Sequence, residues 1–346
     1  MKRSLMTGVF VWIVLLSMSL TAPAQYNQYQ FSHLDINNGL PHNQVNCFYK
    51  DVRGFIWLGT LSGLARYDGY NFKVYRHKIK DKSTISDSDV RNITEGPDGK
   101  LWILTRAGMD IYDPATELFD HDIQPELKKY GIHESSLRML KKGEGGIFWF
   151  LSAATGLYRY DPKSKTTIRI EHEIRRENSI AASPVIDLSE DHAGNVWMIH
   201  ADGTLEMYKK QSGNITQRID LSGKFSNRES DTYRLFIDRQ GLVWVYDIST
   251  STGVYFFDPV QKALKKLSKN SELARLNSDI VTGVIQDNKD NIWISTDHGG
   301  INLVDKKNFS VRYVLNNEDD NKSLSQNNIS SIYYDNLGIV WIGTFR

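Results

Sequence analysis

Seven tryptophans recur along this chain at a nearly constant spacing, and this repeat limits the possible folds more than any other feature. The spacings are 45, 47, 48, 47, 49 and 48 residues, and the positions are Trp57, Trp102, Trp149, Trp197, Trp244, Trp293 and Trp341. The residue before each tryptophan is apolar, Gly stands three residues before it in six copies, and Asp stands six residues before it in five. The exceptions are Asp290 at the glycine position, and Gly96 and Gly143 at the aspartate position. A period of this length predicts a fold made of repeated structural units.

Each repeat contains four segments with the character of short strands. In the fourth repeat these are 185–190, 195–200, 205–209 and 215–219, separated by turns that contain Gly, Asp or Asn. Four short antiparallel strands in about 47 residues are typical of one blade of a β-propeller. We therefore predict an all-β fold in which each tryptophan packs against the neighbouring blade, and not a row of tryptophans that binds a ligand.

The two ends of the chain predict an unusual closure of the propeller. An additional strand is expected at 28–35, where it would serve as the outer strand of the last blade. The seventh repeat supplies a first strand at 329–334 and a second at 339–344, and the chain then stops at Arg346. The expected fold over 25–346 is a seven-bladed β-propeller with about six and a half blades present and the last blade incomplete. We expect this chain to be the front piece of a longer protein.

The first residues are of a different kind. Lys2 and Arg3 precede an apolar stretch, and 22–24 offer small residues for cleavage before Gln25. This pattern predicts a secretory signal peptide at 1–24 and a periplasmic location, with an N-terminal anchor helix as the alternative.

Composition excludes several classes of function. The net charge is +1, and removal of 1–24, which holds Lys2, Arg3 and no acidic residue, leaves 1 − 2 = −1. No basic tract is present, so nucleic acid is not an expected partner. The only cysteine is Cys47, so the fold is expected to lack disulfides. The histidines show no zinc-ligand spacing and the acidic run 318–320 lacks the spacing of a calcium loop, so no metal or cofactor is predicted.

The repeat resembles a known family. The run GFIWLGTLSGLARYDG that begins at Gly54, its sequel at 72–75 and the lead-in at 39–45 are similar to the two-component regulator propeller repeat. The resemblance extends over nearly the whole chain from residue 28 and implies the exported sensor region of a Bacteroidetes hybrid two-component system. In that family, two seven-bladed propellers and a small β-sandwich usually precede a membrane helix, a histidine kinase, a receiver and often a DNA-binding domain.

The resemblance also implies a function. It implies sensing of an oligosaccharide and control of a kinase, with the remaining sensor and kinase domains as partners and a homodimer through those parts as a further option. This sequence itself contains no phosphoacceptor helix, nucleotide-binding glycine box or receiver aspartate cluster. No catalysis is therefore expected from this chain.

Ligand recognition is expected on the face where two kinds of loop meet, those that enter the first strand of each blade and those that join the second strand to the third. Arginines on this face would suit an acidic glycan, because a guanidinium binds carboxylates through two parallel hydrogen bonds. The alternative is that these arginines are solvated or pair with loop aspartates, and that the histidines bond loop carbonyls. The candidate residues are Asn43, Arg91, Arg106, Arg138, His200, Arg234, Asp247 and His298.

Two other classes of function stay open. A propeller glycosidase or lyase is one, because the Asp and Trp pattern superficially resembles the Asp-box turn of sialidases and Arg91, Arg138 and Arg234 would imitate their arginine cluster. Such hydrolysis needs catalytic groups at a fixed separation, which the sequence does not reveal. A protein-binding scaffold is the other class. Turnover would indicate the enzyme, saturable sugar binding without turnover the sensor, and capture of a protein partner the scaffold.

Overall fold

The structure, a computed structural model, describes residues 29–153, 156–176, 178–225, 229–335 and 337–345. The predicted signal peptide at 1–24 lies outside the described residues. The chain divides into two units, 1–32 and 33–346, and every described helix and strand belongs to the second unit. Among the described residues, no helix is both long and apolar enough to cross a lipid bilayer.

Over its described residues, the second unit contains six four-stranded antiparallel sheets and one two-stranded sheet. The first sheet holds β1 (Val45–Lys50), β2 (Ile56–Thr60), β3 (Gly63–Tyr67) and β4 (Phe72–Tyr75). The second holds β5 (Val90–Glu95), β6 (Leu101–Thr105), β7 (Met109–Asp113) and β8 (Leu118–Asp120). The third holds β9 (Leu137–Lys142), β10 (Phe148–Ser152), β11 (Leu157–Asp161) and β12 (Thr166–Ile170). The fourth holds β13 (Val185–Glu190), β14 (Val196–His200), β15 (Thr204–Lys209) and β16 (Asn214–Asp220).

The remaining sheets follow the same order. The fifth sheet holds β17 (Tyr233–Ile237), β18 (Val243–Asp247), β19 (Val254–Asp258) and β20 (Ala263–Leu267). The sixth holds β21 (Val281–Gln286), β22 (Asn291–Thr296), β23 (Gly300–Asp305) and β24 (Val311–Val314), and the seventh holds β25 (Ile329–Tyr334) and β26 (Val340–Thr344). Three short helices complete the list: η1 (Ile36–Asn38), α2 (Gln124–Lys129) and η2 (Glu144–Gly146).

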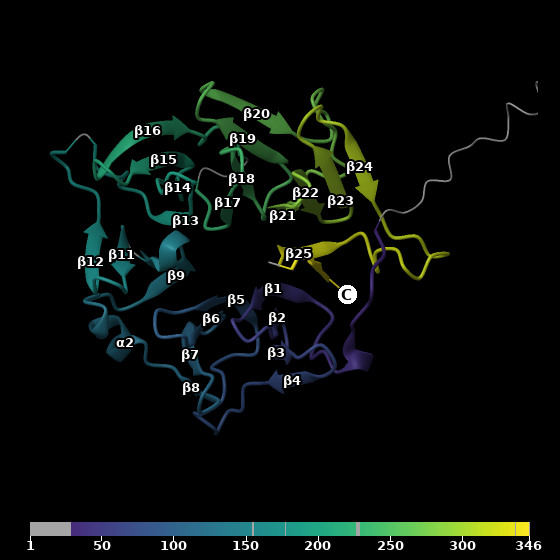
Figure 1. Cartoon of the computed structure of the whole chain (residues 1–346), viewed down its shortest axis with the longest axis horizontal. Helices are drawn as coiled ribbons and strands as arrows, with labels where there is room; N and C mark the ends of the chain where they lie inside the picture. Colours follow the sequence, from purple (N-terminus) through teal and green to yellow (C-terminus); the bar gives the residue numbers. More distant parts are fainter. Residues whose placement is uncertain (1–28, 154–155, 177, 226–228, 336, 346) are drawn as a thin grey trace, which may run out of the picture. The chain divides into compact units, whose positions relative to one another are not determined.

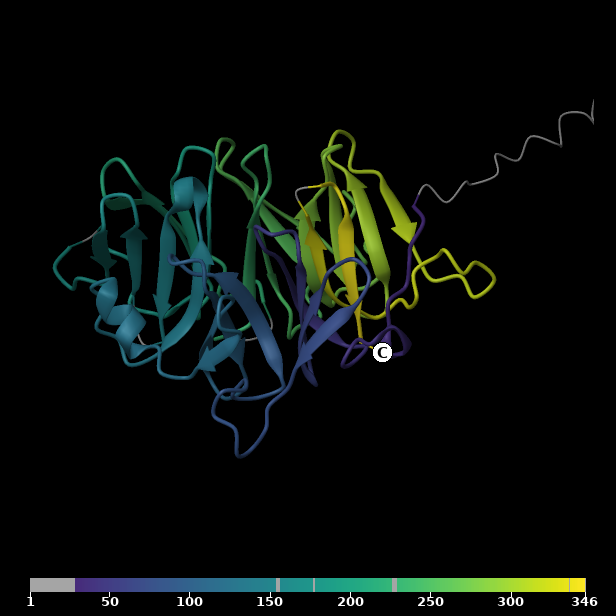
Figure 2. The same cartoon turned by 60° about the horizontal axis from the view of Figure 1, so that its bottom comes forward.

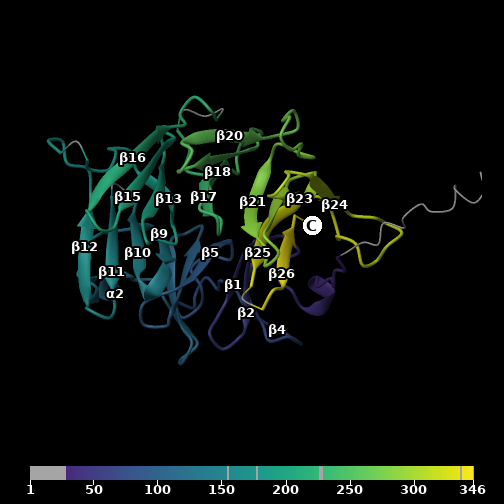
Figure 3. The ribbon, with the colours of Figure 1, turned by 45° about the horizontal axis from the view of Figure 1, so that its top comes forward.

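The sheets of the second unit follow one another around a common centre, with the first strand of each sheet innermost (Figure 1). Their strands run between two opposite loop-bearing ends (Figure 2). The seventh sheet, β25 and β26, contacts the sixth sheet on one side and β1 on the other (Figure 3). This arrangement is an all-β propeller, as the repeat predicted.

Two features differ from the sequence-based expectations. The strand predicted at 28–35 does not form over its described part, 29–35. In a four-stranded sheet, the fourth and outermost strand is held by hydrogen bonds to the third strand. The described part of the seventh sheet contains only β25 and β26, so a strand at 29–35 would have no third strand to pair with. Helix α2 was not predicted, because only six residues form it, and its Leu127 is fully buried in the cluster that contains Trp102.

The aspartate six residues before a tryptophan closes the turn between the first two strands of a sheet. In the first sheet, the Oδ1 atom of Asp51 accepts the backbone N–H of Phe55 (3.0 Å) and its Oδ2 atom accepts the indole N–H of Trp57 (2.9 Å). Gly54 takes a φ of +90°, the left-handed region that favours glycine. Asp290, the exception in the sequence pattern, has a φ of +68° and so takes the equivalent turn conformation.

The core lies between neighbouring sheets. Trp57 is fully buried and belongs to the same cluster as Leu64 of its own sheet and Val90 and Ile93 of the next. Six of the seven repeat tryptophans are at most 2% exposed, whereas Trp341 of β26 is only half-buried. The prediction that the tryptophans pack between blades is confirmed for the five that share a hydrophobic cluster with residues of the next sheet: Trp57, Trp102, Trp149, Trp197 and Trp244.

The first and seventh sheets are joined directly. The hydroxyls of Ser330 and Ser331 donate to the backbone carbonyl of Val45 at 2.7 and 2.6 Å. The Lys50 ammonium lies 3.1 Å from the carboxylate of Asp335. The ring of the second unit is thus closed by side chains that reach from β25 and the turn after it to β1.

Candidate ligand-binding face

The two kinds of loop that the sequence singled out do meet at one end of the sheets. In the second sheet, the backbone N–H of Arg106, just after β6, donates to the carbonyl of Asp89, just before β5 (3.0 Å). The same bond recurs in five more sheets, as Ala153 to Ser136, Ala201 to Pro184, Ile248 to Thr232, Asp297 to Ile280, and Phe345 to Asn328. We call this end, formed by the loops before the first strands and after the second strands, the loop face.

A β-bulge marks the first strand of six sheets at this end. The extra residue is Asn46 in β1, Arg91 in β5, Arg138 in β9, Ile186 in β13, Thr282 in β21 and Ser330 in β25. β17 pairs with β18 without such a shift, and its Arg234 lies opposite Tyr246. Bulges re-aim side chains and are frequent near functional sites. Arg91 and Arg138 therefore occupy equivalent bulges, and Arg234 does not.

Arg91 and Arg106 form exposed ion pairs. Arg91 is 54% exposed and lies 3.4 Å from Asp89, and Arg106 is 67% exposed and lies 3.2 Å from Asp87. The backbone N–H of Asp89 and, to a smaller extent, Arg106 lower the pKa of Asp87. Exposed pairs of this kind are weak, so a ligand could replace either aspartate at little cost.

Arg138 has no such partner. Its side chain is half-buried, and its Nε atom is buried without an acceptor among the described residues. The carboxylate of Glu134, four residues earlier, already accepts the hydroxyls of Ser152 (3.2 Å) and Tyr158 (2.8 Å). This guanidinium is therefore the least satisfied of the predicted arginines.

Asp247, at the end of β18, is buried at 1% exposure. Its Oδ1 atom accepts the hydroxyls of Thr232 (2.6 Å) and Ser249 (2.7 Å), while Oδ2 has no partner among the described residues. Burial opposes ionisation, but these hydrogen bonds outweigh it and lower the pKa of Asp247. Nearby Arg234 donates to the carbonyl of Tyr233 at 2.8 Å.

His200 lies inside the protein and not on its surface. Both ring nitrogens face acceptors, Nδ1 the carbonyl of Ser183 (2.6 Å) and Nε2 the carboxylate of Glu206 (2.9 Å). The His200 and Glu206 side chains have 0% exposure, so this place does not suit direct contact with a ligand. Sequence reasoning missed Glu206, because its place on β15 falls outside the two kinds of loop that it searched.

The two remaining candidates lie in the loops themselves. His298 is 72% exposed, has a φ of +64°, and its Nδ1 atom lies 2.9 Å from the carboxylate of Asp297. Asn43 is half-buried, and its side-chain oxygen accepts the backbone N–H of Ile36 (3.1 Å). His298 is therefore accessible on the loop face, whereas the side-chain oxygen of Asn43 already holds the loop that leads into β1.

A separate cavity lies at the outer margin of the third and fourth sheets, along β12, β15 and β16. Its volume is about 160 Å³, and Arg169, Arg176, Glu173 and Tyr208 are among its lining residues. None of the predicted site residues lines it. The described residues contain no group of three or more His, Cys, Asp or Glu side chains placed to hold a metal ion.

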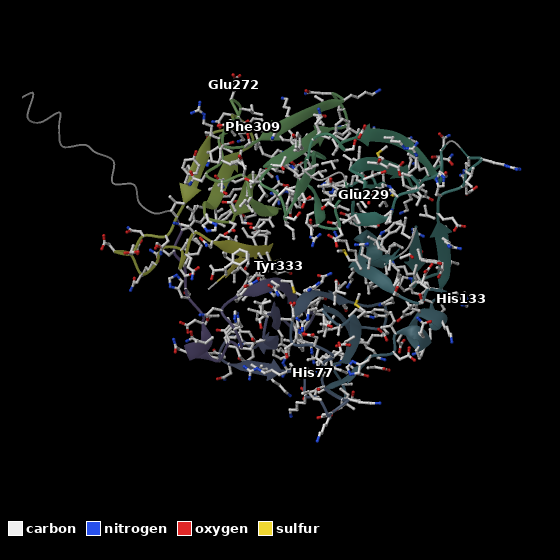
Figure 4. All side chains as sticks on the ribbon, turned by 180° about the vertical axis from the view of Figure 1, so that it is seen from behind. His77, His133, Glu229, Glu272, Phe309 and Tyr333 are labelled. Atoms are coloured by element: carbon white, nitrogen blue, oxygen red, sulfur yellow. The ribbon has the colours of Figure 1, made fainter. Side chains whose placement is uncertain are left out.

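Some of the side chains labelled in Figure 4 lie toward the centre of the ring and others lie at its outer margin. Tyr333 of β25 lies toward the centre, whereas Glu272 and His77 lie at the outer margin (Figure 4). Tyr333 stacks on Phe48 of β1 with ring centroids 6.5 Å apart. These two rings thus pack against each other where the first and seventh sheets meet.

Comparison with known proteins identifies the repeat. The family described as "Two component regulator propeller" matches residues 39–62 and 323–346. A histidine kinase, P4, from Formosa agariphila is 33% identical over 79 residues, which are 23% of this chain and 6% of the kinase. This chain therefore spans a small part of the length of that relative.

Solved structures share the fold. The extracellular domain of a candidate hybrid two-component system from B. thetaiotaomicron superposes with a TM-score of 0.67 at 20% identity, over 92% of this chain and 41% of that one. A streptogramin B lyase superposes with a TM-score of 0.56 at 12% identity, over 88% of this chain and 92% of the lyase. At these identities the likeness establishes the propeller fold and leaves the function to the site.

Proposed function

Because the chain carries two-component regulator propeller repeats at 39–62 and 323–346, we propose that it is the exported ligand-sensing propeller of a hybrid two-component regulator. This repeat match is the observation that carries the proposal. The similarity to a histidine kinase over 79 residues supports it, since a regulator of this kind joins a sensor to a kinase.

The proposed ligand is an oligosaccharide bound at the loop face. Sugars are recognised by planar hydrogen-bonding groups and by pockets with a few placed polar side chains. The loop face offers such groups on several sheets: the guanidinium groups of Arg91, Arg106 and Arg138, and the imidazole of His298. The proposed role is recognition alone, without catalysis.

The proposal includes the surroundings of this propeller. The two-stranded seventh sheet suits an incomplete blade whose remaining strands come from another segment of a longer protein. In that protein the remaining sensor and kinase domains are the partners, and a homodimer forms through them. Residues 1–24 act as a signal peptide that directs the sensor to the periplasm.

Thermal unfolding across a panel of oligosaccharides tests the function. A ligand that binds only the folded state raises the unfolding midpoint in proportion to its affinity and concentration. A midpoint raised by one class of sugar, with the sugar recovered unchanged by chromatography, supports the sensor. Conversion of the sugar would instead indicate an enzyme. A midpoint that no sugar raises but a protein partner does would indicate a scaffold.

A further inference from the structure

Two of the bulge residues of the first strands find a hydrogen-bond partner in the next sheet. The side-chain amide of Asn46, in the bulge of β1, donates to the carbonyl of Val90 at the start of β5 (2.9 Å). The hydroxyl of Ser330, in the bulge of β25, donates to the carbonyl of Val45 at the start of β1 (2.7 Å). These bonds attach the first sheet to the second and the seventh sheet to the first at the loop face, so a polar bulge side chain has a structural role when it is paired across sheets.

Arg138 differs from these two bulge residues. It occupies the equivalent bulge of β9, yet it forms no hydrogen bond or ion pair with any described residue. Its Nε atom is shielded from solvent, and the carboxylate of Glu134 is already engaged by Ser152 and Tyr158. A shielded donor on a charged group destabilises the protein unless an acceptor is supplied. The described residues therefore supply no acceptor to Arg138.

We propose that Arg138 binds an anionic group of the ligand, a carboxylate or a sulfate ester, so that the sensor recognises an acidic oligosaccharide. The inference rests on the proposed function, and it names the chemical class of the ligand and the residue that selects it. A guanidinium donates two parallel hydrogen bonds to a carboxylate or sulfate, which supplies both the acceptor and the opposite charge. A neutral sugar hydroxyl would supply an acceptor and leave the charge of Arg138 uncompensated.

The paired arginines of the loop face do not carry the same inference. Arg91 and Arg106 are more than half exposed and each has an aspartate within 3.4 Å. Solvent and these aspartates already satisfy them, so a ligand gains less from either. Selectivity for an acidic sugar is thus expected to depend on Arg138 more than on its neighbours.

Calorimetry and thermal unfolding of the purified protein test this, with Arg138→Gln as the variant and Arg53→Gln as the control. Arg53 pairs with Asp51 in the β1–β2 turn, away from the loop face. The probes are a galacturonate trisaccharide, a sulfated galactose trisaccharide, the neutral galactose trisaccharide and inorganic sulfate, all at one ionic strength. We expect at least one anionic probe to raise the midpoint more than the neutral sugar, and Arg138→Gln to weaken that binding at least tenfold while Arg53→Gln changes it less than twofold.

The outcomes separate the two proposals. Comparison of the galacturonate trisaccharide with the sulfated galactose trisaccharide shows whether the protein binds a carboxylate or a sulfate ester. Without ligand, Arg138→Gln should leave the midpoint unchanged or raise it, and a fall of several degrees would show a structural role and overturn the inference. If the neutral sugar binds and Arg138→Gln leaves this binding intact, the proposed sensor function stands and the proposal of an anionic ligand is rejected. If inorganic sulfate binds in a way that requires Arg138 and no sugar binds, Arg138 forms an anion site but the proposal of an oligosaccharide ligand is rejected. If neither anionic sugars nor sulfate stabilise the wild-type protein, the inference fails.

Discussion

The buried carboxylate of Glu206, which contacts His200, shows how single residues of this propeller are held. Glu206 accepts hydrogen bonds from the His200 ring, the backbone N–H of Ala181 and the guanidinium of Arg218. Burial opposes ionisation of Glu206, but these bonds outweigh it and keep its pKa below the ordinary 4.5. His200 is therefore tied to the folded state through a carboxylate that must stay ionised.

This pair makes stability sensitive to acid. A carboxyl with a lowered pKa binds fewer protons when folded, so its stabilisation is complete above its ordinary pKa of 4.5 and is lost as the pH falls toward the folded value. We expect Glu206→Gln to flatten the decline of unfolding free energy with falling pH in this acid range. At neutral pH it should cost about 3 kcal/mol, because it weakens a buried charged network.

Urea unfolding at a series of pH values from neutral to acid measures both effects. Glu272→Gln, in the exposed loop after β20, serves as the control and should change neither the stability nor its pH dependence. An acid-induced decline of the same slope in Glu206→Gln and in the wild type would contradict the assignment.

At the scale of strands and turns, the sequence correctly predicted the elements that lie at a fixed distance from each repeat tryptophan. Strands at 185–190 and 329–334 form as expected, because the apolar positions around each tryptophan recur in every repeat. The aspartate turns follow from one local set of bonds, as around Asp51. These features depend on contacts between residues of the same repeat, and those residues are part of the repeating sequence pattern.

The remaining features depend on contacts between repeats. A bulge inserts one residue without any signature of its own, so the sequence grouped Arg234 with Arg91 and Arg138, although β17 has no bulge. His200 was expected on a loop, but Glu206 of the neighbouring strand holds it inside the protein. The strand expected at 28–35 had no third strand to pair with among the described residues.

The seventh sheet gives a direct test at this scale. Trp57 of β2 is fully buried, while Trp341 of β26 is half-buried and its indole N–H lies 3.5 Å from Asp335, a long contact. We expect Trp57→Ala to cost about 4 kcal/mol and Trp341→Ala about 1–2 kcal/mol, because less apolar area is lost from the partly open sheet. Urea unfolding of the two variants measures the difference. Equal losses would mean that β26 is as well packed as the complete sheets.

The ring as a whole resists unfolding differently from an open row of repeats. In an open row, each repeat contacts only its neighbours and the end repeats fray. Here β1 contacts β25 and β26, and Lys50 reaches Asp335 across that junction. The Lys50 side chain is 13% exposed and that of Asp335 is 1% exposed, so this pair is much more buried than an ordinary surface pair. The closure therefore couples the first and last sheets into one cooperative unit.

Breaking this junction should have a larger effect than breaking a comparable pair inside the ring. Lys142 of β9 pairs with Glu95 of β5 at 2.6 Å, and its side chain is 42% exposed. We expect Lys50→Met to cost about 3 kcal/mol and Lys142→Met about 0.5 kcal/mol. Hydrogen exchange should then quicken in β1, β25 and β26 of Lys50→Met before it does in the fourth and fifth sheets, since two free ends would have been created. If exchange instead rose evenly around the ring, or if both variants lost the same stability, closure between the first and seventh sheets would add nothing beyond an ordinary contact between neighbours.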